Sequence, residues 1–237
     1  MAPWVSPDNT LEQQAQRVAT LYLEVVDLSD GLGVPANDAR RVALNNIASA
    51  ISAEVGILRL IDHINRQTPE VRRHIFGVGS DATFEVVRQD VLTAGRGHLL
   101  VESQFQIENA LRNVLRTLDP ARQIQGFVNI VKEAVGRSGV TDTDAIESVL
   151  RTAAKIRNTL HANGIHHGPP IEIAFGGVRF ELVDGAPAEC GSIQHITELV
   201  RASVNATIAV FRGPRVAALA FVADSYVQAR RPGAAAG

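Results

Sequence analysis

The chain has 237 residues, of which 46% are hydrophobic, and its formal net charge is -2 at pH 7. This composition provides enough apolar side chains for a buried core and excludes a chain that is disordered throughout. The near-neutral charge argues against a globally cationic nucleic-acid-binding protein, so any contact with RNA must be local. Cys190 is the single cysteine, which excludes an intramolecular disulfide and fits a reducing compartment.

The sequence shows neither a secretory nor a membrane-spanning pattern. Residues 1–10 lack the basic start and the apolar run of a signal peptide. The most apolar stretch, 204–223, is interrupted at 212–215 by two arginines, a glycine and a proline, which a lipid-facing helix would not tolerate. We therefore expect a cytoplasmic protein without membrane contact.

Helical periodicity begins near the N-terminus. Ser6 and Pro7 have the chemistry of an N-cap followed by a first helical residue, and apolar residues then recur every three or four positions as far as Val25. Glycines and a proline at 31–35 end this stripe. A second, longer apolar stripe predicts another helix over 44–64.

The middle of the chain continues the helical pattern. Apolar stripes over 81–91 and 101–118 are separated by a Gly-Arg-Gly sequence at 95–97, which predicts two helices or one kinked helix. The Asp-Pro pair at 119–120 has the chemistry of a cap and a first helical residue for the next helix, which glycines at 136–139 end.

The following helix is predicted to end at a group of polar residues. Thr141, with Asp144 three residues later, forms an acidic variant of the capping box, and an apolar stripe follows over 146–160. Gly164 favours a helix stop, because glycine adopts the left-handed conformation at little cost. The helix is therefore expected to end just after His161.

In the last part of the chain the spacing of apolar residues changes from a helical period to strict alternation. Residues 171–183 alternate apolar and polar on either side of Gly176 and Gly177, which is the pattern of a β-hairpin with a two-residue turn. Ser192 can cap a final long helix, and a shorter one follows from Pro214. The sequence thus predicts a mainly α protein, a helical bundle with one small β-hairpin inserted before the C-terminal helix.

The sequence contains no internal repeat and no change of composition that would mark a linker. The Gly-Val-Gly-Ser stretch at 77–80 is the one plausible joint. It divides the chain into an N-terminal helical region, 1–78, and a helical bundle with the hairpin, 79–230. The N-terminal region forms either a separate lobe or a part of one continuous domain, and residues 231–237 are expected to form a flexible tail.

The chemically distinctive segment lies at the end of the helix predicted to finish at His161. Arg157 and His161 are four residues apart and share one helix face, where the helix passes from buried to exposed surface. If the Arg157 charge keeps the imidazole neutral, His161 can act as a general base, while the guanidinium holds a phosphate through two hydrogen bonds. These groups suit RNA cleavage by its own 2′-hydroxyl. No metal or other cofactor is needed, and the sequence offers no compact cluster of carboxylates to hold a metal.

This segment resembles the HEPN superfamily, helical-bundle proteins whose catalytic members are metal-independent endoribonucleases in toxin-antitoxin, antiviral defence and RNA-processing systems. The likeness rests on Arg157, the polar Asn158 and His161 in the penultimate long helix, and it covers residues 81–211. The resemblance implies a homodimer in which Arg157 and His161 of both protomers face each other across a shared cleft. Arg157 would position the phosphate, His161 would act in acid-base catalysis, and Asn158 would orient these groups or hydrogen-bond.

A basic strip adjoins this segment. Arg151 and Lys155 lie on one helix face with Asn158 and would guide an RNA backbone, or they form an ordinary solvated face. His166 and His167, in the loop that follows, lack a carboxylate partner nearby in the sequence, which disfavours a metal site there.

The alternative to catalysis is structural. Three residues separate Arg157 from His161, whereas the catalytic HEPN pattern has four to six. In the structural interpretation Arg157 pairs with a carboxylate such as Glu102 or Glu108, and His161 bonds the last carbonyls of its helix. The chain would then be a non-catalytic helical module for dimerisation or for binding a protein partner.

Overall fold

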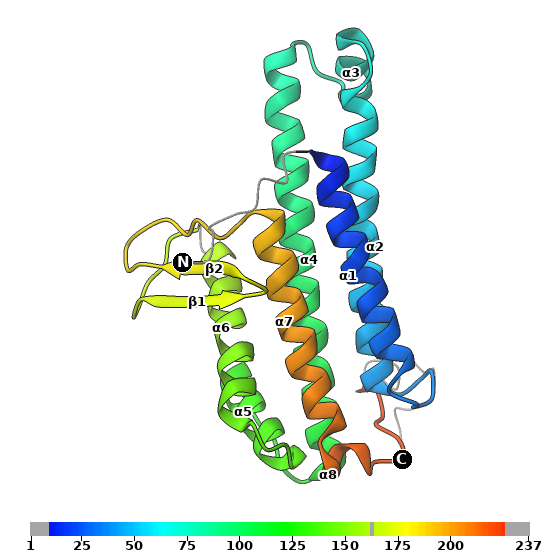
Figure 1. Cartoon of the computed structure of the whole chain (residues 1–237), viewed down its shortest axis with the longest axis vertical. Coiled ribbons are helices and arrows are strands. Elements are labelled where there is room, and N and C mark those ends of the chain that lie inside the picture. Colours follow the sequence, from blue (N-terminus) through cyan, green and yellow to red (C-terminus); the bar gives the residue numbers. More distant parts are fainter. Residues whose placement is uncertain (1–9, 162–163, 226–237) are drawn as a thin grey trace, which may run out of the picture. The chain divides into compact units, whose positions relative to one another are not determined.

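The computed structural model describes residues 10–161 and 164–225, apart from the side chain of His161. These residues form a mainly α structure with one small antiparallel sheet before the last long helix, as the sequence predicts (Figure 1). None of the described helices combines the length and the apolar character needed to cross a membrane. The helices are α1 (Leu11–Asp30), α2 (Ala39–Asn65), α3 (Pro69–Phe76), α4 (Asp81–Leu118), α5 (Phe127–Ser138), α6 (Thr143–His161), α7 (Ile193–Arg212) and α8 (Pro214–Ala217).

The chain divides into two compact units, each assembled from separate stretches of sequence. Unit 1 consists of residues 1–23, 49–102 and 156–199, and unit 2 consists of the remainder, 24–48, 103–155 and 200–237. Each unit boundary falls inside a helix, so five helices have one part in unit 1 and the other part in unit 2; they are α1, α2, α4, α6 and α7. The stretch 77–80, predicted as a joint, connects α3 to the first part of α4, and both belong to unit 1.

The apolar stripe of α1 is buried as predicted, since Ala15 and Val18 are fully enclosed in unit 1. The helix begins with a capping box. The backbone N–H of Gln13 donates to Thr10 Oγ1, and the backbone N–H of Thr10 donates to Gln13 Oε1, both at 3.2 Å. The predicted cap, Ser6 with Pro7, lies outside the described residues.

Helix α4 is one helix of 38 residues rather than two. The Gly-Arg-Gly sequence at 95–97 does not interrupt it. A glycine in a helix interior costs only about 1 kcal/mol relative to alanine. The burial of Leu92, Leu99 and Leu100 on the same helix outweighs this small loss.

Two predicted helix starts are wrong. Helix α4 ends at Leu118, and Asp119 does not cap a helix but pairs with Arg137 at 3.1 Å. The next helix, α5, begins only at Phe127. Helix α6 begins at Thr143, so Thr141 is not its N-cap. Aspartate, threonine and proline have similar preferences for caps and for loops, and local sequence does not separate the two.

A buried ion pair in unit 2 connects two segments that are far apart in the sequence. Arg40 donates through Nε and Nη2 to the two carboxylate oxygens of Asp38, at 2.9 and 2.7 Å. The guanidinium also donates to the carbonyls of Val216 and Leu219, and Asp38 accepts the N–H of Val222. The pair therefore fastens the segment after α7 to the start of α2.

The predicted hairpin is formed by β1 (Ile171–Phe175) and β2 (Val178–Leu182), which pair in an antiparallel register. The turn residues Gly176 and Gly177 have φ values of 55° and 79°. Positive φ at both central positions defines the type I′ turn, whose twist matches that of the two strands.

The hairpin lies against α7 (Figure 1). The ring of Phe180 packs edge-on against the ring of His195, with 5.0 Å between the ring centroids. At the turn, a Cβ on Gly176 would overlap the Glu198 carboxylate, so residue 176 must be glycine for this packing. These contacts place the hairpin beside the N-terminal part of α7 in unit 1.

Candidate functional site

The last turns of α6 border a pocket of about 270 Å³ in unit 1. Its wall is mainly apolar, and two arginines, Arg96 and Arg157, are among the residues that line it. The lining residues are Thr93, Arg96, Gly97, Leu100 and Val101 of α4, Arg157 and Leu160 of α6, Gly191, and Ile196 of α7.

Arg157 is partly buried at the wall of this pocket, and its Nε is buried without a hydrogen-bond partner. Within the described residues its guanidinium forms neither a hydrogen bond nor an ion pair. Glu108, one of the two partners considered for Arg157, pairs with Arg112 at 2.7 Å instead. A buried donor without an acceptor typically destabilises a protein by about 1–3 kcal/mol, which an anion bound in the pocket would relieve.

Arg96 provides the second guanidinium. Its Nε donates to the carbonyl of Leu92 at 3.0 Å and its Nη2 to Thr93 Oγ1 at 3.1 Å, so neutral acceptors hold the group in place. Burial lowers the pKa of Arg96, and the Glu54 carboxylate opposes this change. An arginine stays protonated in a protein, so the group remains a cation.

The sequence did not indicate Arg96 as a site residue, because the Gly-Arg-Gly pattern at 95–97 predicts only an interruption or a kink of the helix. A Cβ on Gly97 would meet no atom within 4 Å, so this glycine leaves the pocket wall open. An arginine beside a glycine on the same face as the apolar Leu100 is a weak local signal. Only the fold brings Arg96 and Arg157 to the same pocket.

Three of the other predicted site residues, Asn158, Arg151 and Lys155, are not among the described residues that line this pocket. His161 is the last residue of α6, as predicted, but its side chain lies outside the described residues. Asn158 is exposed. Arg151 and Lys155 are exposed as well and belong to unit 2.

His166 fixes the chain where α6 ends. It is buried, its Nε2 lies 3.0 Å from the carbonyl of Pro169, and its Nδ1 lies 3.1 Å from Thr159 Oγ1. Because a carbonyl only accepts, Nε2 donates to Pro169, and Nδ1 of the neutral ring accepts from the threonine hydroxyl. Gly164, with a φ of 73°, donates to the carbonyl of Thr159 and stops the helix, as predicted. The role of His166 is structural.

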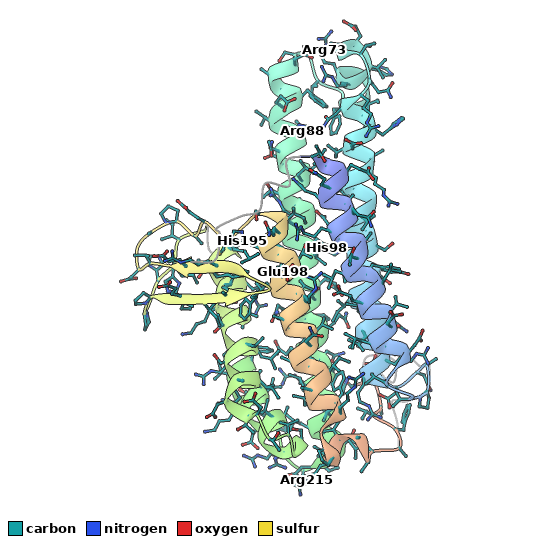
Figure 2. All side chains as sticks on the ribbon, viewed as in Figure 1. Arg73, Arg88, His98, His195, Glu198 and Arg215 are labelled. Atoms are coloured by element: carbon teal, nitrogen blue, oxygen red, sulfur yellow. The ribbon has the colours of Figure 1, made fainter. Side chains whose placement is uncertain are left out.

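His195 is also engaged on both ring nitrogens. Its Nε2 donates to the carbonyl of Arg179 at 3.1 Å, and its Nδ1 lies 2.7 Å from Ser192 Oγ (Figure 2). Burial lowers the pKa of His195, and the bond to Arg179 opposes this change. Ser192 accepts the backbone N–H of His195 and caps α7, as predicted.

A second pocket, of about 210 Å³, shares Arg96 with the first. Glu54 on α2 lines it, and both oxygens of this carboxylate are buried without a hydrogen-bond partner. Burial raises the pKa of Glu54 to about 7, against the opposing charge of Arg96. The other lining residues are Leu11, Gln14, Leu58, Arg88, Gln89 and Leu92.

The arrangement of Arg96 and Arg157 suits an anion. Planar guanidinium groups donate paired hydrogen bonds to phosphate or carboxylate oxygens, and an apolar surrounding strengthens such bonds. Among the described residues, no three histidine, cysteine, aspartate or glutamate side chains lie close enough together to hold a metal ion.

No known protein family, no curated protein and no solved structure matches the chain.

Proposed function

We propose that the chain is a HEPN-like, metal-independent endoribonuclease that binds an RNA phosphate between Arg96 and Arg157. The observation that carries this proposal is the buried Nε of Arg157, which has no hydrogen-bond partner among the described residues, in a pocket that a second arginine also lines. Two positive charges in a mainly apolar pocket attract an anion and are incompletely satisfied without one. Phosphate is the anion that every RNA nucleotide supplies.

The second chemical group of this proposal is His161. It follows Arg157 by four residues on α6, which puts the two residues on one helix face. A neutral imidazole can take the proton of the 2′-hydroxyl, while the arginines offset the charge that develops on the phosphate. Asn158 would hydrogen-bond to the nucleotide, and Arg151 and Lys155 would contact the RNA backbone outside the pocket.

The proposed enzyme acts as a homodimer. In this arrangement the Arg157 and His161 of one protomer face those of its partner across a shared cleft, with one RNA strand between them. A two-fold arrangement brings the same surface of both protomers together.

A non-catalytic module is the second candidate. The observation that favours it is the spacing, since three residues separate Arg157 from His161, fewer than in catalytic HEPN proteins. The chain would then bind an anionic group of RNA or of a protein partner in the same pocket without cleaving it.

The decisive experiment is cleavage of a fluorescently labelled single-stranded RNA by the purified full chain in excess EDTA. We expect cleavage by the unaltered chain and a loss of about 100-fold or more in Arg157→Ala and in His161→Ala. Arg96→Ala should weaken RNA binding. Arg66→Ala is the matched control, because Arg66 is an exposed arginine that pairs with Asp62.

Each result separates the two candidates. RNA binding that requires Arg157, without any cleavage, identifies the non-catalytic module. Equal cleavage by the unaltered chain, Arg157→Ala and His161→Ala would overturn the proposed site. Circular dichroism of each variant tests whether the fold is retained.

A further inference from the structure

Glu54 is a buried acid whose carboxylate has no hydrogen-bond partner among residues 10–161 and 164–225. Its relative exposure is 1%, and neither carboxylate oxygen is hydrogen-bonded. The carboxylate lies against the backbone of α4 at Gly95, where a Cβ would overlap it. Burial favours the neutral form of such a group, because it removes the water that would solvate the charged carboxylate.

The charged groups that line the pocket beside Glu54 come from α4 alone. They are Arg88 and Arg96, whereas α1 contributes the uncharged Leu11 and Gln14. Arg88 is engaged by Glu85, to which its Nη2 and Nε donate at 2.7 and 2.9 Å (Figure 2 shows Arg88 on α4). Arg96 donates to the neutral Leu92 carbonyl and Thr93 hydroxyl, so its charge is the one that acts on Glu54.

Arg96 lines both pockets and therefore connects Glu54 to the proposed anion site. An ionised Glu54 offsets the positive charge of Arg96 and weakens its attraction for an anion. A protonated Glu54 leaves both Arg96 and Arg157 available. By reciprocity, an anion bound to Arg96 must strengthen the binding of a proton to Glu54 by the same factor.

We infer that the Arg96–Arg157 pocket takes up its anion together with a proton on Glu54, which makes this glutamate a pH-dependent regulator of the site. The inference rests on the anion binding of the proposed function. Burial raises the pKa of Glu54 to about 7, so the regulation falls in the neutral range.

Sulfate is a suitable probe, because its charge stays constant between pH 6 and 8. We expect isothermal titration of the full chain to show sulfate binding about tenfold tighter at pH 6 than at pH 8, because an ionised Glu54 offsets the charge of Arg96 at the higher pH. Titrations at pH 7 in two buffers of different ionisation enthalpy should reveal proton uptake on binding.

Glu54→Gln should bind sulfate tightly at both pH values and without proton uptake. Glu54→Met provides a second neutral side chain in case the amide perturbs the fold, which circular dichroism will reveal. Glu70→Gln is the matched control, since it removes an exposed carboxylate on α3 that pairs with Arg73, away from the residues that line this pocket. This control should keep the pH dependence of the unaltered chain.

Absence of sulfate binding, pH-independent binding, or a pH dependence that persists in both neutral Glu54 variants would overturn the inference. Parallel assays with RNA distinguish a failure of the inference about Glu54 from a failure of the proposed function. RNA cleavage with pH-independent sulfate binding overturns only the role of Glu54. Proton-linked sulfate binding without any RNA binding overturns only the proposed function.

Discussion

Glu54 and Gly95 are in direct contact, because the missing side chain at residue 95 leaves the space that the Glu54 carboxylate occupies. The glycine is therefore a packing feature of α4 and not an interruption of the helix. The contact holds the acid beside Arg96, the residue that connects the two pockets.

The contact between Glu54 and Gly95 can be measured by a double-mutant cycle. Gly95→Ala should gain about 1 kcal/mol of helix propensity when combined with Glu54→Ala, but should lose this gain in the unaltered chain, where the new methyl group displaces the carboxylate. Urea unfolding measures both effects. Gly97→Ala is the control, because its Cβ meets no atom, and it should stabilise both backgrounds equally. Additive effects at residues 54 and 95 would contradict the contact.

Glu54 should make the stability of the protein depend on pH. Its pKa rises from the ordinary value of 4.5 to about 7, so the folded protein binds this proton more tightly than the unfolded chain. The free energy of unfolding should therefore fall as the pH rises from 4.5 to 7, by about 3 kcal/mol in total, and stay level above that range.

Glu54→Gln should remove this pH dependence. The variant should be more stable than the unaltered chain at pH 8 and of similar stability near pH 4.5, as measured by urea unfolding at both pH values. Glu70→Gln, at an exposed ion pair with Arg73, should leave the slope in place. The same slope in Glu54→Gln would assign the pH dependence to other groups.

The buried pair of Asp38 and Arg40 should dominate the acid sensitivity of unit 2. Burial alone would raise the pKa of Asp38, but hydrogen bonds from Arg40 and Val222 and the Arg40 charge lower it overall. This stabilisation is present above pH 3.8 and is lost as the pH falls through the lowered pKa.

Asp38→Asn should destabilise the protein by roughly 3–5 kcal/mol at pH 7, because it leaves the buried Arg40 charge without a countercharge. Chemical denaturation at pH 7 measures this loss. Arg41→Met is the matched control. Arg41 pairs with the exposed Asp30, so its loss should cost about 1 kcal/mol or less. Equal losses in the two variants would show that burial does not matter for the first pair.

The two turn glycines of the hairpin should respond differently to alanine. Both have positive φ, so each substitution strains the backbone by about 1–2 kcal/mol. Gly176→Ala should cost more than Gly177→Ala, since only the Cβ of residue 176 overlaps Glu198. Thermal unfolding of both variants, alone and combined with Glu198→Ala, measures the difference. The difference should shrink when Glu198 is removed, and a constant difference would contradict the contact.

Features that depend on neighbouring residues could be predicted from the sequence. The hairpin follows from the alternation around Gly176 and Gly177, and the Ser192 cap and the end of α6 follow from local turn chemistry. The starts of α5 and α6 could not be predicted in this way. Asp119 resembles a cap, but it pairs with Arg137, which a distant part of the sequence supplies.

The candidate site could be predicted in part. Arg157 stands out because of the residues around it, and in the structure it is one of the residues that line the pocket of about 270 Å³. Arg96 and Glu54 did not stand out, since their roles depend on helices α2, α4 and α6 meeting in unit 1. Hydrophobic periodicity identifies which face of a helix is buried, but not which helix packs against it.

Each unit is built from segments that are far apart in the sequence, and this limits when the unit can fold during synthesis. Unit 1 requires residues near position 11 and residues as late as Leu199, and unit 2 requires segments from both sides of that point. A nascent chain that emerges from the ribosome cannot complete either unit until α7 has been translated. Both units can therefore complete their folds only after α7 has been translated. Until then the apolar faces of the early helices lack their packing partners, and a chaperone can bind them.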